Sequence, residues 1–151
     1  MAALGNSALV TRGHRALLGR RSARVSAYAE RLHLIGGVLE VLGTPAFPAN
    51  RAGIEAHLWM ELHEETGLRF GEERRDGWPR VLGLARDEFL QQPELFWQWE
   101  VGVELEALLT RMDPAEHSGG VIVERGDMPA ALREELTPVA RVAWEQWSRG
   151  T

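Results

Sequence analysis

The sequence has no cysteine among its 151 residues. This absence excludes both a disulfide framework and a metal site built from thiolates, and it leaves the redox compartment unassigned. Lysine is absent as well, so arginine supplies all 17 basic side chains. We attribute the lack of lysine to genomic base composition, and it therefore assigns no role to any single arginine.

Excess positive charge and long apolar runs are also missing. The formal net charge is -5 and no basic stripe occurs, which argues against a polymeric nucleic acid as a partner. No apolar run approaches membrane length, and the first seven residues lack the charged and apolar regions of a secretion signal. We therefore expect a cytoplasmic protein with no nucleic-acid or membrane partner.

Length and composition indicate one globular unit. Apolar residues make up 44% of the chain and charged residues 26%, and 151 residues can form one sizeable core but not two ordinary domains. No repeat, low-complexity tract or linker interrupts the order of segments. We predict a single domain over residues 1–151.

The hydrophobic pattern predicts an α/β fold with a mixed sheet between helices. Gly13 and His14 are expected to form a hairpin turn, and Gly67 is expected to end an acidic helix. Proline is expected in the first turn of two C-terminal helices. Strands are predicted over residues 7–11, 15–18, 32–41 (strand and turn), 81–85, 95–105 and 119–123, and helices over 53–66, 129–136 and 138–147.

Three carboxylates lie close together in the segment Glu-Leu-His-Glu-Glu-Thr-Gly-Leu at residues 61–68. Glu61, Glu64 and Glu65 stand at positions i, i+3 and i+4, so a helix places them side by side, where like charges repel. A bound cation would remove this repulsion.

The position of these carboxylates on the helix strengthens that interpretation. Ile54, Leu58 and Leu62 recur every four residues and mark the face that packs on the protein. At about 100° per residue, Glu65 lies about 20° from Leu58, and Glu61 lies about 20° from Ile54. Burying these charges is costly unless they are paired or coordinated, and clustered oxygen ligands suit magnesium or manganese. The alternative is a solvated acidic surface at the end of a helix.

A strand that runs into a Gly-Gly turn precedes the acidic helix, with the sequence Leu-Ile-Gly-Gly-Val-Leu-Glu at residues 34–40. Together with the acidic helix, it resembles the Nudix box, Gly-x5-Glu-x7-Arg-Glu-U-x-Glu-Glu-x-Gly-U with U apolar, whose second half is matched at residues 61–68. Residues 17–22 are similar to the strand that leads into the box in this family. The resemblance runs from Ala8 to Trp147 and implies the α/β/α sandwich of the Nudix family.

The sequence departs from the box in three places. Met60 stands where the family has the arginine that orients a neighbouring glutamate. The early glutamate of the box is replaced by Gly43 or Ala52, depending on where the gap is placed. Residues 38–53, which contain two prolines, form a longer segment than the usual box has before its helix. These departures keep open a Nudix-like domain that binds a nucleotide without cleaving it.

Three further strings are similar to Nudix enzymes that hydrolyse UDP-glucose. They are Val-Leu-Gly-Leu-Ala-Arg-Asp at residues 81–87, the aromatic segment at 95–99, and Pro-Ala-Glu-His-Ser-Gly-Gly-Val-Ile-Val at 114–123. The long insertion before the acidic helix is similar to that branch too. The resemblance implies hydrolysis of the diphosphate bond of a nucleotide sugar, with UDP-glucose giving UMP and glucose 1-phosphate.

The family resemblance also implies which residues form the site. The metal ligands would be Glu61, Glu64 and Glu65, with the main-chain carbonyl of Gly36, and they would hold Mg2+ or alternatively Mn2+. Some members place a further glutamate from a late loop near the attacking water, and Glu116 is our candidate for that role. The catalytic set is therefore Glu61, Glu65 and Glu116. The alternative for Glu116 is an ordinary solvated loop residue.

Substrate contacts are assigned to four residues. Arg21 and Arg86 each follow a strand end and are expected to contact the diphosphate; the alternative for each is an intramolecular or surface ion pair. Gly37 and His117 complete the predicted substrate-binding set, and His117 could instead cap the loop.

The aromatic residues fall into two groups. Phe96, Trp97 and Trp99 could stack on a uracil ring, but neighbours on a strand point to opposite faces, so at most one face serves a ligand. Trp144 and Trp147 have helical spacing and are expected to form core or dimer contacts, which makes a homodimer possible.

Three functions remain open from the sequence. The first is a metal-dependent diphosphatase for a nucleotide sugar. The second is another Nudix diphosphatase, acting on ADP-ribose or a modified nucleotide. The third is a weakly catalytic Nudix-like module that binds a nucleotide.

Overall fold

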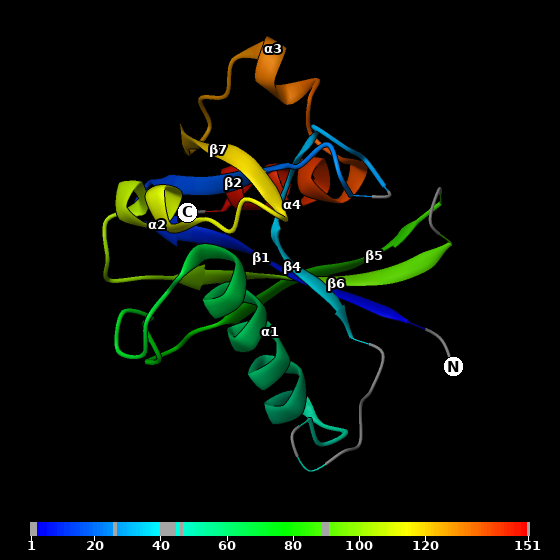
Figure 1. Cartoon of the computed structure of the whole chain (residues 1–151), viewed down its shortest axis with the longest axis vertical. Helices are drawn as coiled ribbons and strands as arrows, with labels where there is room; N and C mark the ends of the chain where they lie inside the picture. The colour runs from blue at the N-terminus through cyan, green and yellow to red at the C-terminus, as the bar shows by residue number, and fades with distance from the viewer. Residues whose placement is uncertain (1–2, 26, 40–44, 46, 89–90, 151) are drawn as a thin grey trace.

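The computed structural model describes residues 3–25, 27–39, 45, 47–88 and 91–150. Its strands form one mixed sheet with the order β3-β2-β1-β6-β5, in which β4 also pairs with β1 and β7 also pairs with β2 (Figure 1). The β1–β6 pair is parallel and the other pairs are antiparallel. The strands are β1 (Leu4–Arg12), β2 (Arg15–Arg21), β3 (Leu32–His33), β4 (Ile35–Leu39), β5 (Arg80–Asp87), β6 (Gln92–Glu100) and β7 (His117–Glu124).

Helices cover both sides of the sheet, which confirms the predicted arrangement. The helices are α1 (Arg51–Thr66), α2 (Leu105–Arg111), α3 (Ala130–Arg133) and α4 (Pro138–Arg149). In Figure 1 the strands β1, β6 and β5 run between α1 and α4. No helix in the described part of the chain is long and apolar enough to cross a membrane.

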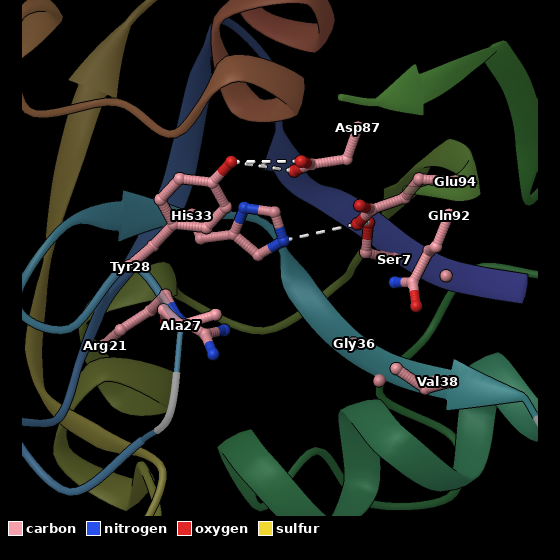
Figure 2. A pocket seen from close by; sticks show the side chains of 12 residues that line it. Ser7, Arg21, Ala27, Tyr28, His33, Gly36, Val38, Asp87, Gln92 and Glu94 are labelled. Atoms are coloured by element: carbon pink, nitrogen blue, oxygen red, sulfur yellow. Dashed lines mark hydrogen bonds and ion pairs between the residues drawn. The ribbon is translucent and has the colours of Figure 1, made fainter. Parts of the chain in front are cut away.

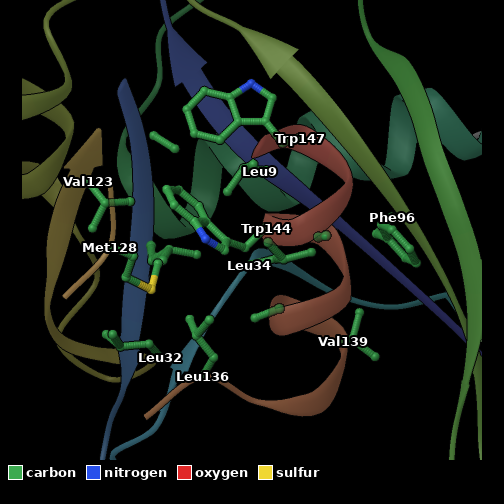
Figure 3. Packing of buried hydrophobic residues seen from close by; sticks show 14 residues of the cluster. Leu9, Leu32, Leu34, Phe96, Val123, Met128, Leu136, Val139, Trp144 and Trp147 are labelled. Atoms are coloured by element: carbon green, nitrogen blue, oxygen red, sulfur yellow. The ribbon is translucent and has the colours of Figure 1, made fainter. Parts of the chain in front are cut away.

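Strand β1 is buried on both faces and separates two apolar clusters. Leu9 belongs to the cluster under α4, whereas Ala8 and Val10 belong to the cluster under α1 and α2. Trp144 and Trp147 fill the first cluster with 1% of each side chain exposed (Figure 3), so the prediction of a core role is confirmed. A homodimer stays a prediction.

The aromatic strand follows the alternation expected of a sheet. Phe96 packs in the α4 cluster, and Trp97 and Trp99 pack in the α1 cluster. All three are at most 1% exposed. None of them therefore presents a free ring face on which a uracil could stack.

The caps of α1 explain where this helix begins and ends. The Asn50 side chain accepts a hydrogen bond from the Gly53 amide at 3.0 Å, so the helix begins at Arg51, two residues before the predicted start. Gly67 ends it in the left-handed region with φ of 69°, as predicted.

Three predicted elements were wrong in extent. Strand β6 ends at Glu100, and the residues that were predicted to continue it lead into helix α2, which was not predicted. The amide of Gly102 donates to the Glu72 carbonyl oxygen at 2.7 Å, which turns the chain away from the sheet. The helix predicted over 129–136 is helical only over Ala130–Arg133. The predicted strand over 32–41 is interrupted at Leu34, and its end lies outside the described residues.

Candidate active site

Two connected cavities form a cleft across β4. The acidic lobe, about 330 Å³ in volume, is lined by acidic side chains from α1 and from the loop after α2. The polar lobe, about 100 Å³, lies beside it (Figure 2). Both lobes share Arg21, Gly36, Gly37 and Val38. The acidic lobe adds Glu61, Glu64, Glu65, Asp113 and Glu116, and the polar lobe adds Gly5, Ser7, Ala27, Tyr28, His33, Asp87, Gln92 and Glu94.

The acidic helix carries its carboxylates as the apolar stripe predicts. Leu58 and Leu62 are fully buried, and Glu65 beside them is only 6% exposed. The Glu61 side chain is 19% exposed and Glu64 is exposed in the lobe. The prediction that two carboxylates lie within the packing face is therefore confirmed, and a purely solvated acidic surface does not describe this helix.

Glu65 is the most buried of the three glutamates, so a charge on it is the least favourable. Its Oε1 lies 2.8 Å from His117 Nε2, and its Oε2 is buried without a hydrogen-bond partner among the described residues. Burial, followed by the hydrogen bond to Glu61 and the charges of Glu61 and Glu116, raises the pKa of Glu65 to about 10. Without a cation, Glu65 is therefore protonated at neutral pH.

His117 is the buried partner of Glu65 at the start of β7. Burial first, and then the positive charge of Arg21, lowers the pKa of His117 to about 4. At neutral pH the histidine and the Glu65 carboxyl are thus both uncharged, and their contact is a hydrogen bond. His117 does not line either lobe, so the structure places it behind the acidic lobe.

Glu61 lies one turn earlier and has the opposite environment. Its Oε1 is 3.3 Å from His57 Nε2, and hydrogen bonding to His57 is the main reason that the pKa of Glu61 is lowered. Gly37 faces the same carboxylate so closely that a Cβ there would come within 2.8 Å of both oxygens. A larger residue at position 37 would therefore displace the Glu61 carboxylate from its present position.

The loop before β7 brings Glu116 to the acidic lobe. The Asp113 amide donates to the Glu65 carbonyl oxygen at 2.8 Å, and Ser22 Oγ donates to the Ala115 carbonyl oxygen at 2.9 Å. These bonds tie the loop to α1 and β2. The Glu116 side chain is exposed and lines the lobe, as its predicted role requires.

The two predicted diphosphate arginines are placed differently. Arg21 lines both lobes, and only its Nε has a partner, the Ala27 carbonyl oxygen at 2.8 Å; its terminal nitrogens have none among the described residues. Arg86 is exposed and donates to Gln91 Oε1 at 2.8 Å. It lines neither lobe, because side chains alternate along β5 and it is Asp87 that reaches the cleft.

Residues of the polar lobe were not identified from the sequence. Tyr28 donates to both Asp87 oxygens at 3.0 and 3.1 Å, and Glu94 Oε1 accepts from Ser7 Oγ at 3.1 Å (Figure 2). His33 Nε2 lies 3.3 Å from the same Glu94 oxygen. These side chains come from distant segments, and no spacing in the sequence connects them.

The residues of the acidic lobe fit a divalent cation by their chemistry. Carboxylate oxygens are the ligands that Mg2+ and Mn2+ prefer, and the buried Glu65 Oε2 has an unused lone pair. Within the described ranges, however, no three histidine or acidic side chains form a preassembled metal cluster. Glu61 and Glu65 are instead held by one histidine each. Of the residues offered for the early box glutamate, Ala52 is exposed in the first turn of α1, and Gly43 lies outside the described residues.

No family model and no curated protein matches the sequence. Solved structures do match. A MutT Nudix hydrolase from Burkholderia pseudomallei aligns with 97% of this chain and 98% of its own, at 22% identity and a TM-score of 0.64. A Nudix hydrolase from Nitrosomonas europaea aligns with 97% of this chain and 88% of its own, at 16% identity and a TM-score of 0.62.

A larger protein also matches. The bifunctional NMN adenylyltransferase/ADP ribose pyrophosphatase from Francisella tularensis aligns with 94% of this chain at 15% identity and a TM-score of 0.63, and the chain spans 39% of its length. At such identities the likeness establishes architecture and not activity. The chain thus has the fold of the Nudix hydrolases.

Proposed function

We propose that the protein is a metal-dependent diphosphatase that cleaves the diphosphate bond of a nucleoside diphosphate derivative. The observation that carries this proposal is the acidic lobe itself. Three glutamates of one helix turn line the same cleft as Arg21. Among the described residues, one oxygen of the buried Glu65 and the terminal guanidinium nitrogens of Arg21 have no hydrogen-bond partner. Such a cleft repels a diphosphate unless a cation is bound.

Each residue has a task in this reaction. Glu61, Glu64 and Glu65 would hold Mg2+ or Mn2+, and a bound divalent cation offsets charge on phosphoryl oxygens and activates water. Arg21 can donate to the diphosphate from its free terminal nitrogens. Glu116 is exposed at the lobe and can accept a proton from the attacking water.

UDP-glucose is the substrate that we propose first. The resemblance of residues 81–87 and 114–123 to that branch motivates this choice, and the polar lobe supports it. Its carboxylates, Asp87 and Glu94, accept hydrogen bonds when ionised and suit the hydroxyl groups of a sugar. The same carboxylates disfavour an additional phosphate.

ADP-ribose is an equally supported second candidate. It has the same diphosphate and a hydroxyl-rich terminal group, and the Francisella tularensis neighbour is described as an ADP ribose pyrophosphatase. A nucleotide-binding module without turnover is the third possibility, which the absence of an arginine at Met60 motivates.

Turnover on a substrate panel tests these alternatives. With magnesium, UDP-glucose should exceed ADP-ribose and nucleoside triphosphates in kcat/KM by at least about tenfold, which corresponds to roughly 1.4 kcal/mol in transition-state binding. A tenfold preference for ADP-ribose would select the second substrate. Nucleotide binding without turnover on any substrate, with or without magnesium, would contradict the proposed activity.

A further inference from the structure

A continuous chain of hydrogen bonds runs from the core of the protein to the acidic lobe. Trp97 Nε1 on β6 donates to Asn6 Oδ1 on β1 at 2.8 Å. Asn6 Nδ2 contacts the Ile54 carbonyl oxygen at 3.0 Å and His57 Nδ1 at 3.1 Å. Trp97, Asn6 and His57 are 1%, 0% and 3% exposed. Water is therefore excluded from the links between Trp97, Asn6 and His57.

The two outer partners of Asn6 determine how its amide is oriented. An indole N–H can only donate, so the Asn6 atom facing Trp97 must be the oxygen. A carbonyl oxygen can only accept, so the atom facing Ile54 must be the NH2 group. Both requirements agree, and the amide group donates to His57 Nδ1.

The orientation of Asn6 in turn determines the tautomer of His57. Because Nδ1 accepts a hydrogen bond, it carries no proton, and the neutral ring has its proton on Nε2. This nitrogen lies 3.3 Å from Glu61 Oε1. Phe47 packs edge-on against the imidazole, with ring centroids 5.5 Å apart and an interplanar angle of 82°, which restrains its rotation.

The Glu61 carboxylate is thus held from two sides. His57 offers an N–H from the preceding helix turn, and Gly37 on β4 provides the space that the carboxylate fills. Met60, directly before Glu61, has no hydrogen-bond donor. Among the described residues, His57 and the protonated Glu65 offer a donor to this carboxylate, and the hydrogen bond from His57 lowers the pKa of Glu61 more.

We propose that His57 is a positioning residue that orients Glu61 toward a divalent cation, and that Asn6 and Trp97 hold it in the required tautomer. The proposal rests on the proposed function, since it assigns Glu61 to a cation site. It assigns His57 no contact with the substrate. Outer partners of metal-binding carboxylates commonly change metal affinity by about 10- to 100-fold when they are removed.

Binding of Mn2+ to the substrate-free protein, measured by electron paramagnetic resonance, tests the proposal without relying on activity. His57→Leu should weaken Mn2+ binding by about 10- to 100-fold. His57→Gln retains an N–H near the position of Nε2 and should bind Mn2+ nearly as tightly as the wild type. His63→Leu is the matched control, because His63 lies on the same helix but contacts the Leu68 carbonyl oxygen and no carboxylate.

Magnesium dependence of turnover separates orientation from general damage. High magnesium should restore much of the activity of His57→Leu, because a weakened cation site can still be filled. A folded His57→Leu protein with wild-type Mn2+ affinity would overturn the proposal. If the wild type itself bound no Mn2+, the proposed function would fail first, and the role of His57 with it.

The tautomer can be observed directly, whether or not the variants fold. Long-range proton–nitrogen NMR spectra of the metal-free wild type should give the pattern of a histidine protonated at Nε2 for His57. A proton on Nδ1 instead would reject the relay from Trp97 and Asn6. That result would leave the Mn2+ affinity of the wild type unchanged, so it is distinguishable from a failure of the proposed function.

Discussion

Glu61 and Glu65 are one helix turn apart, face the same lobe and have opposite acid–base properties. The pKa of Glu61 is lowered by its hydrogen bond to His57, whereas burial raises the pKa of Glu65 to about 10. Each carboxylate contacts one histidine, at 3.3 Å for Glu61 and 2.8 Å for Glu65. Contact with a histidine alone therefore does not decide whether a carboxylate is charged.

Solvent access and neighbouring charge account for the difference. Glu65 is packed against the sheet, with an oxygen that no described group satisfies, and the negative charge of Glu61 adds to the cost of ionising it. Glu61 keeps some contact with solvent and accepts a hydrogen bond from His57. A cation between the two carboxylates would favour ionisation of both, so the contrast belongs to the metal-free protein.

Loss of the Glu64 and Glu65 carboxylates together has the largest expected effect. Glu64→Gln combined with Glu65→Gln should abolish hydrolysis and also the rise in melting temperature that magnesium produces, because a ligand bound only by the folded state stabilises it by mass action. Thermal unfolding with and without magnesium measures this. An unchanged magnesium-dependent shift in the double variant would exclude these two residues from the site.

Glu116 affects Glu65 from across the lobe, and its removal should have the next largest effect. Glu116→Gln should lower kcat by about 10²- to 10⁴-fold with KM nearly unchanged, the range that loss of a general base commonly gives. Steady-state kinetics on the preferred substrate provide the measurement, and Glu104→Gln, on an exposed side chain that lines neither lobe, serves as the control. Wild-type turnover in Glu116→Gln would return this residue to an ordinary surface role.

Arg21 is the positive group that opposes the rise in the pKa of Glu65. Arg21→Gln should raise KM by about 10- to 100-fold, since hydrogen bonds to charged groups contribute roughly 1.5–3 kcal/mol. Arg86→Gln should leave KM unchanged, because Arg86 lines neither lobe. Equal effects of the two substitutions would contradict the placement of the diphosphate at Arg21.

The remaining prediction concerns stability as a function of pH. The pKa of Glu65 is raised from 4.5 to about 10, so the folded metal-free protein keeps a proton that the unfolded chain releases. The linked stabilisation is complete below pH 4.5 and is lost as the pH rises toward 10, by at most about 1.4 kcal/mol per pH unit. The contribution of Glu61 to stability depends on pH in the opposite direction. Because its pKa is lowered, this contribution is present above pH 4.5 and is lost as the pH falls below 4.5.

Urea unfolding without divalent ions measures this effect. Between about pH 6 and pH 9, the free energy of unfolding of the wild type should fall relative to that of Glu65→Gln, which cannot titrate. Parallel curves for the two proteins would mean that Glu65 is already ionised in the folded state.

Much of the fold was predictable because its signals are local. The hairpin turn at Gly13, the end of α1 at Gly67 and the apolar stripe from Leu58 to Leu62 each depend on residues within a few positions of one another. Strand β6 was extended too far because Val101 and Val103 continue the apolar pattern, whereas the bond between Gly102 and Glu72 at the end of the strand joins residues 30 positions apart and leaves no local signal.

For the site, the sequence by itself determined that Glu61, Glu64 and Glu65 share one helix turn and that two of them lie within the packing face, because helical geometry depends only on spacing. Tertiary structure decided the rest. It placed His117 behind Glu65, brought Asp87 instead of Arg86 to the cleft, and linked Asn6 to His57 across 51 residues of sequence. Burial and hydrogen-bond partners set the charge of each carboxylate, and both depend on segments that meet only when the chain has folded.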